Sequence, residues 1–171
     1  RAVIEALLKA PNINPNQATP NGVTPLHVAV EIGHLEVVQT LLNAANINPN
    51  PTTPNGLTPL HIAAKNGRQN IVQELLKVNG IDPNKTIMNG ETPLFISAQM
   101  GHLDVVQTLL NAPNIKSNLS KKNGSTPLFV AAEKDFPEIV QELLKIEGID
   151  PNQPLPNGAT PLFIAAQNNN L

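Results

Sequence analysis

One short pattern that recurs at a fixed spacing limits this chain more than any other feature. The pattern Asn-Gly-x-Thr-Pro-Leu occurs five times, and each copy lies 34 residues after the previous one; the copies begin at Asn21, Asn55, Asn89, Asn123 and Asn157. Self-similarity with a period of about 20–50 residues is typical of proteins that stack one small unit repeatedly. We therefore expect a repeat architecture in which each unit packs against its neighbours.

The residues that follow each Asn-Gly predict a short helix. Thr24 is a residue type that caps helix N-termini, and Pro25 suits the first helical position, where no backbone N–H is needed. The helix is expected to run from Pro25 to about Ile32. The next column holds only residue types that tolerate a left-handed backbone, namely Gly33, Gly67, Gly101, Asp135 and Asn169.

A second and longer helix is expected to start near Leu35. Val37, Val38, Leu41 and Leu42 form an apolar stripe at helical spacing. The column at its end contains only Asn and Gly, which favour a left-handed helix cap; its members are Asn12, Asn46, Gly80, Asn114 and Gly148. An isoleucine and then a Pro-Asn pair follow in most copies, so each unit ends in an extended loop.

This unit resembles the ankyrin repeat. The motif Thr-Pro-Leu-His-x-Ala of that family occurs here at Thr24 and Thr58. The resemblance covers the whole chain and implies an all-α ankyrin-repeat solenoid of stacked helix-turn-helix units with β-hairpin-like loops. The period is one residue longer than the usual 33 of the family, and Phe replaces the motif His at Phe95, Phe129 and Phe163.

The repeat boundaries predict a single domain over residues 1–171. Four full repeats are expected at 21–54, 55–88, 89–122 and 123–156, with partial repeats at 1–20 and 157–171. Because the chain opens and closes inside a repeat, we expect it to be a fragment of a longer protein. A second period of 68 residues links Val37 with Val105 and Ile71 with Ile139, which indicates duplication of a two-repeat block.

Composition excludes several kinds of partner. The net charge is −2 with 14% charged residues, so the chain lacks the basic excess that nucleic acid or an anionic membrane would need. Trp and Tyr are absent, which leaves few aromatic anchors for a small-molecule substrate. There is no cysteine, no nucleophile motif and no His pair at metal-ligand spacing. We expect no catalytic residue, no cofactor and no metal, and the resemblance implies that His27 and His61 have a structural role.

The resemblance also implies where a protein partner binds. In ankyrin proteins the contact surface is the concave face, built from loop tips and the exposed side of the first helices. The columns there vary in this chain, and several carry apolar side chains, including Ile32, Leu57, Ile87, Met88 and Met100. The predicted partner-binding residues are Val23, Ile32, Leu57, Asn66, Met88, Glu91, Met100, Lys122 and Lys134.

The leading hypothesis is therefore a monomeric scaffold for protein–protein interaction that is not itself an enzyme. The alternative is a substrate-recruiting or targeting arm of an enzyme whose catalytic domain lies outside this segment. An Asn- and Ile-rich composition suggests an AT-rich genome, and ankyrin arrays of this kind are common in intracellular bacteria that deliver them into host cells, and in protists. This context predicts a cytoplasmic protein and a host-directed bacterial effector.

Overall fold

The computed structural model describes residues 2–168, and within them it contains ten α-helices and no β-strand. The chain divides into two compact units, Arg1–Asp82 and Pro83–Leu171. The predicted all-α repeat class is confirmed. No helix in the described segment is long and apolar enough to cross a membrane.

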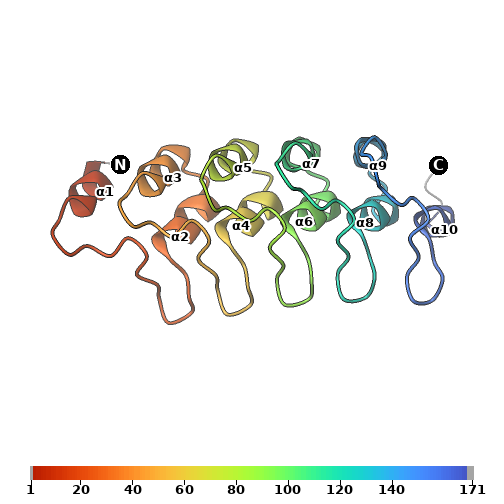
Figure 1. Cartoon of the computed structure of the whole chain (residues 1–171), viewed down its shortest axis with the longest axis horizontal. Helices are drawn as coiled ribbons and strands as arrows, with labels where there is room; N and C mark the ends of the chain where they lie inside the picture. The colour runs from red at the N-terminus through yellow and green to blue at the C-terminus, as the bar shows by residue number, and fades with distance from the viewer. Residues whose placement is uncertain (1, 169–171) are drawn as a thin grey trace. The chain divides into compact units, whose positions relative to one another are not determined.

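The first unit contains an initial helix and two helix pairs. The helices are α1 (Ala2–Leu8), α2 (Pro25–Ile32), α3 (Leu35–Leu42), α4 (Pro59–Lys65) and α5 (Gln69–Leu76). α2 packs on α3 and on α4, while α3 also contacts α1 and α5. Within this unit, the long loops before α2 and α4 project from the side of the first helices that faces away from the second helices (Figure 1).

The second unit contains two helix pairs and a final helix. Its helices are α6 (Pro93–Gln99), α7 (Leu103–Leu110), α8 (Pro127–Glu133), α9 (Pro137–Leu144) and α10 (Pro161–Gln167). α8 is the central helix of this unit because it contacts α6, α9 and α10. The loops before α6, α8 and α10 project in the same way as those of the first unit (Figure 1).

Each first helix starts as the sequence predicts. Thr24 is the N-cap of α2, and its hydroxyl accepts the backbone N–H of His27. The same Thr–Pro start occurs at α4, α6, α8 and α10. A capping threonine satisfies one of the orphan amides of the first turn and is worth about 1 kcal/mol. Because helices of seven or eight residues are marginal alone, such caps matter here.

The predicted left-handed columns are confirmed within the described residues. Gly33, Gly67, Gly101 and Asp135 have positive φ, and Asn169 lies outside the described residues. All five members of the Asn/Gly column also have positive φ; they are Asn12, Asn46, Gly80, Asn114 and Gly148. However, these residues do not cap the second helix directly. The second helix of that repeat ends at Leu42, four residues before Asn46, and has eight residues.

The core of each unit consists of small and branched side chains at the helix contacts. In the first unit Leu26, Val30, Val38, Leu60 and Ile71 are at most 2% exposed. In the second unit the same columns are filled by residues such as Leu94, Val106 and Leu128, which are also buried. The alanines of the first helices, among them Ala63 and Ala131, are fully buried. Their small side chains let neighbouring helices approach closely.

A column of asparagines joins successive repeats. The Nδ2 of Asn16 donates to the carbonyl of Asn46 at 2.7 Å, and its Oδ1 accepts the N–H of Asn48 at 2.7 Å. Asn84 makes the same pair of bonds to Asn114 and Lys116, both at 2.8 Å. The remaining bridges of this kind are formed by Asn50 with Gly80 and Asp82, and by Asn118 with Gly148 and Asp150. Each such amide therefore ties one extended loop to the next.

Close packing also fixes a glycine at the end of a first helix. Gly101 has a φ of +77°, and a Cβ added to it would lie 2.7 Å from the Phe136 ring. Phe136 begins the second helix of the following repeat as the N-cap of α9. Any side chain at position 101 would therefore meet both backbone strain and an aromatic ring.

The asparagine bridge predicts that two substitutions in the same column lower the free energy of unfolding by different amounts. Asn84→Ala removes both inter-repeat bonds and should lower the free energy of unfolding by about 1–2 kcal/mol. Asn152 occupies the same column, is exposed, and makes no side-chain bridge within the described residues. Asn152→Ala should change stability by less than about 0.5 kcal/mol. Urea denaturation of both variants checks this, and equal costs would contradict the role of the bridge.

The contact at Gly101 makes a second prediction. Gly101→Ala should destabilise the chain by about 3 kcal/mol, because overpacking against Phe136 adds to the left-handed strain. Gly148→Ala is the control, since Gly148 also has positive φ but no atom lies within 4 Å of its added Cβ. It should cost only about 1 kcal/mol from strain. Thermal denaturation of both variants measures the difference, and a smaller loss for Gly101→Ala would refute the packing argument.

Candidate functional site

The loop tips are the first component of the predicted site, and backbone hydrogen bonds shape each of them. In the first unit the N–H of Thr19 donates to the carbonyl of Val23 at 2.9 Å, and the N–H of Gly22 donates to Thr19 at 2.9 Å. The corresponding bonds recur at Thr53, Ile87, Lys121 and Leu155. Each tip is therefore a narrow, hairpin-like turn with a fixed shape, although no strand is assigned within the described residues.

His27 connects the start of α2 to the next tip. Its Nδ1 accepts the backbone N–H of Thr24 at 3.1 Å, so this nitrogen carries no hydrogen. The neutral ring then bears its hydrogen on Nε2, which donates to the carbonyl of Leu57 at 3.2 Å. The structural role expected for this histidine is visible in these contacts. Leu57 is half-buried, so its side chain is less available to a partner than its place near a tip suggests.

In the second unit an ion pair and an aromatic ring organise a tip where Phe replaces the motif His. The Nζ of Lys121 lies 3.7 Å from a carboxylate oxygen of Glu91 and 5.2 Å from the centre of the Phe95 ring. Lys121 also belongs to the tip preceding α8, whereas Glu91 and Phe95 belong to the α6 repeat. The side chain of Lys121 therefore joins two repeats, which His27 does in the first unit by a hydrogen bond.

Neighbouring tips of the second unit are also bonded directly. The N–H of Lys122 donates to the carbonyl of Asn89 at 2.9 Å. A Cβ added to Gly90 would lie 3.0 Å from the Cα of Lys121, so the two tips are in close contact. Lys122 itself is exposed, and its side chain is free of the ion pair that holds Lys121. The tips before α6 and α8 thus present one continuous surface to solvent.

The structure places the predicted partner-binding residues at different depths. Ile32, Met88 and Met100 are large apolar side chains with exposures of 54%, 66% and 43%. Asn66, Lys122 and Lys134 are exposed as well, whereas Val23, Leu57 and Glu91 are half-buried. The first unit holds Val23, Ile32, Leu57 and Asn66, and the second unit holds the other five.

Lys121 and Lys122 are adjacent lysines at the same loop tip, and the sequence alone does not distinguish them. The contacts of Lys121 with Glu91 and Phe95 show that the two lysines differ, since Lys121 is structural and Lys122 is exposed. The asparagine bridges were also missed. The signal was present, because Asn occupies that column in all five copies, including Asn118, where the preceding proline is replaced by Ser117.

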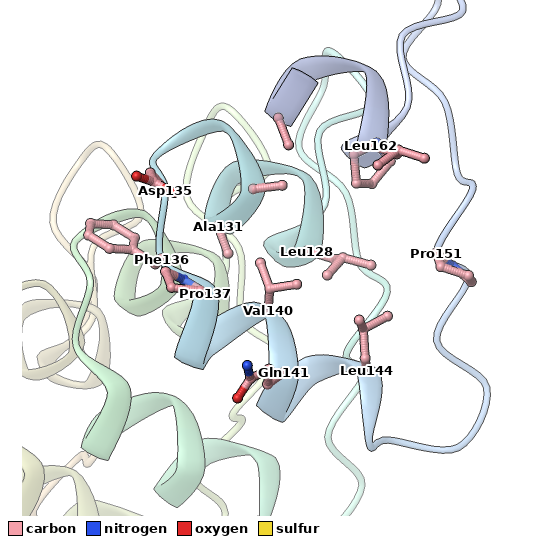
Figure 2. A pocket seen from close by; sticks show the side chains of 13 residues that line it. Leu128, Ala131, Asp135, Phe136, Pro137, Val140, Gln141, Leu144, Pro151 and Leu162 are labelled. Atoms are coloured by element: carbon pink, nitrogen blue, oxygen red, sulfur yellow. The ribbon is translucent and has the colours of Figure 1, made fainter. Parts of the chain in front are cut away.

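Apolar grooves lie beside α10 in the second unit and beside α1 in the first unit. In the second unit a groove of about 360 Å³ lies among α8, α9 and α10, and its lining includes Leu128, Val140, Leu144 and Leu162 (Figure 2). In the first unit a groove of about 430 Å³ is lined by residues of α1, α2 and α3, including Leu7 and Val28.

Titratable side chains are dispersed. Within residues 2–168 no group of three or more His, Asp or Glu side chains is placed so that it could hold a metal ion. Ser97, a buried hydroxyl in α6, donates to the carbonyl of Leu94 at 3.0 Å, as expected for a serine that replaces a core alanine.

Comparison with known families gives a direct assignment. The model for ankyrin repeats in three copies matches residues 1–87, 46–120, 78–154 and 114–171, which together span the chain. The chain belongs to the ankyrin repeat family. No curated relative matches it. Ankyrin repeats act in general as protein-interaction modules, so the tips and first-helix ends described above form the candidate binding site of this ankyrin chain.

His27 also makes the stability of this ankyrin domain sensitive to pH. Burial lowers the pKa of His27 below its ordinary value of 6.5, against the opposing effects of the Leu57 and Pro51 carbonyls and of Glu31. The folded chain therefore favours the neutral ring, whose Nδ1 can accept the Thr24 amide. As the pH falls through 6.5 the unfolded chain takes up the proton first, and stability is lost.

We expect His27→Phe to reduce this pH dependence, because phenylalanine fills the same column at Phe95 and Phe129. The variant loses the bond to Leu57, about 1 kcal/mol, at neutral pH. Its free energy of unfolding should then change less than that of the unmodified chain between about pH 7.5 and 5.5. Urea titrations at both pH values test this, with His34→Asn as the exposed control. If the free energy of unfolding of His27→Phe changes with pH as much as that of the unmodified chain, the pH dependence does not come from His27.

Proposed function

We propose that this chain binds a protein partner through its loop tips and the ends of its first helices, and that it does not catalyse a reaction itself. Family membership supports the general role. The observation that carries the choice of surface is the exposure of Ile32, Met88 and Met100 at these positions, although such side chains are usually buried. Apolar surface gains free energy when a partner covers it, and a few well-covered side chains carry most of the binding energy.

The second unit carries the more distinctive set of exposed residues at the tips and helix ends. Both methionines of the chain lie there, Met88 at a tip and Met100 as the C-cap of α6. The flexible thioether of methionine adapts to irregular partner surfaces. Lys122 follows Met88 in the tip column of the next repeat, and Lys134 follows Met100 in the helix-end column. Both lysines are exposed. These residues suit a protein segment that presents apolar side chains with acidic neighbours.

The first unit presents a neutral counterpart of this surface. Its tip column contains Pro20 and Pro54, and its helix-end column contains Ile32 and Asn66. The surrounding tip bonds are the same, so the difference lies only in the side chains. We infer that the first unit contributes apolar contact and that the lysines of the second unit set the preferred charge of the partner. The predicted cytoplasmic location and effector role remain proposals that follow from composition.

Substitution of exposed apolar residues tests the binding surface. Ile32→Glu and Met100→Glu should each weaken binding of a captured partner about tenfold, because each places a charge in an apolar contact. Leu144→Glu is the matched control, since Leu144 is 50% exposed but lies on the second helix α9. It should leave affinity unchanged.

The measurement is affinity capture followed by titration of the purified partner with each variant. Circular dichroism and melting must first show that all three variants are folded. Equal weakening by Leu144→Glu, or unchanged affinity in both Ile32→Glu and Met100→Glu, would assign the partner to another face. Lys122→Glu should in addition weaken binding of an acidic partner more at low salt than at high salt.

A further inference from the structure

Seven Asn-Gly pairs occur in the chain, and one of them differs from the others in its surroundings. Five lie at the loop tips, one is Asn66-Gly67 at the end of α4, where the Gly67 amide donates to the carbonyl of Ala64 at 3.4 Å, and the seventh is Asn79-Gly80, in the turn after α5. In the other repeats the position of Asn79 is filled by Pro11, Ala45, Pro113 and Glu147. The Asn79-Gly80 pair is therefore a departure from the repeat pattern and not part of the tip motif.

An Asn-Gly pair can undergo an intramolecular reaction that changes its charge. The amide nitrogen of the glycine loses its proton to solvent and attacks Cγ of the asparagine, forming a C–N bond in a five-membered succinimide, while the bond from Cγ to Nδ2 breaks and ammonia leaves. Water then opens the ring at either carbonyl and gives aspartate or isoaspartate. Glycine favours the reaction because it has no Cβ to obstruct ring closure, and asparagine is accordingly among the thermolabile residues.

The tip pairs are restrained against this reaction by their hydrogen bonds. The attacking nitrogen of each tip glycine donates to the carbonyl three residues earlier at 2.8–2.9 Å; these glycines are Gly22, Gly56, Gly90, Gly124 and Gly158. The side-chain oxygens of Asn89, Asn123 and Asn157 also accept the amide two residues later. Breaking the glycine bond costs about 1 kcal/mol, which corresponds to about a fivefold slower reaction.

Asn79-Gly80 lacks these restraints. Within residues 2–168, no acceptor is hydrogen-bonded to the Gly80 amide, and the Asn79 amide group makes no hydrogen bond. Asn79 is exposed, and a Cβ built on Gly80 would have no atom within 4 Å. The nucleophile and the electrophile are thus both accessible to water and free to approach each other.

We propose that Asn79 is a site of spontaneous deamidation, converted to aspartate and isoaspartate faster than any loop-tip asparagine of the folded chain. The reaction has a structural consequence because the carbonyl of Gly80 accepts Nδ2 of Asn50 at 2.7 Å. Isoaspartate inserts an extra methylene into the main chain immediately before Gly80. The Asn50 bridge to Gly80 and Asp82 is then displaced, so ageing of Asn79 loosens one inter-repeat link of the first unit.

The test is to incubate the folded 171-residue chain at neutral pH and physiological temperature and follow deamidation by peptide mass spectrometry. Trypsin releases residues 78–85, which contain Asn79, and electron-transfer fragmentation separates isoaspartate from aspartate. The peptide 78–85 should be modified at least about fivefold faster than each tip pair. The same chain in concentrated urea is the control, since all seven pairs should then react at similar rates.

Two outcomes would overturn the proposal. One is an Asn79 rate in the folded chain equal to or below that of the tip pairs, and the other is no modification of Asn79. Asn79→Gln should abolish the product at this position without changing the melting temperature, which separates chemistry from folding. Hydrogen exchange of aged protein should show increased exchange at Asp82 relative to Asn79→Gln, because Oδ1 of Asn50 accepts that amide.

Discussion

The structure depends on one constraint: a pair of seven- or eight-residue helices cannot bury its own apolar face. Helices of this length are marginal alone, so each pair must obtain its stability from the next. Leu60 and Val38 reach near-complete burial only because α2 and α3 pack on the helices of the following repeat. The connections that hold repeats in register are consequently as important as the helices. Here they are the asparagine bridges, the His27 bond to Leu57, and the contact of Lys121 with Glu91 and Phe95.

Much of this architecture could be predicted because the same local backbone requirement recurs in every repeat. The Thr-Pro start, the left-handed Gly or Asp after the first helix and the Asn/Gly turn all follow from backbone geometry, which a residue type reveals directly. The end of the second helix was predicted too far along the chain, because an αL residue was taken as its cap. A separate turn follows Leu42 and ends at Asn46. Several residues in that turn have propensities that are also compatible with a helix.

The contacts between repeats were less predictable, because they join residues about 30 positions apart. Nothing in the local sequence shows that Asn84 reaches Asn114 and Lys116, or that Lys121 pairs with Glu91 while Lys122 points to solvent. The candidate site shows the same limit. The columns were identified from their variability, but only the structure separates exposed Met88 and Met100 from half-buried Leu57 and Val23. Burial at these positions depends on the side chains of the adjacent repeat.

Asparagine serves three different purposes in this fold, and hydrogen bonding decides which one applies. At Asn46 it supplies a left-handed turn, at Asn84 it bridges two loops, and at the tips it precedes a glycine that the turn requires. The residue pair that makes such a turn easy to form is also chemically labile. At the tips the turn's own hydrogen bond engages the nitrogen that would react. At Gly80 the same residue pair occurs without that bond, so the local geometry that favours the turn does not protect it.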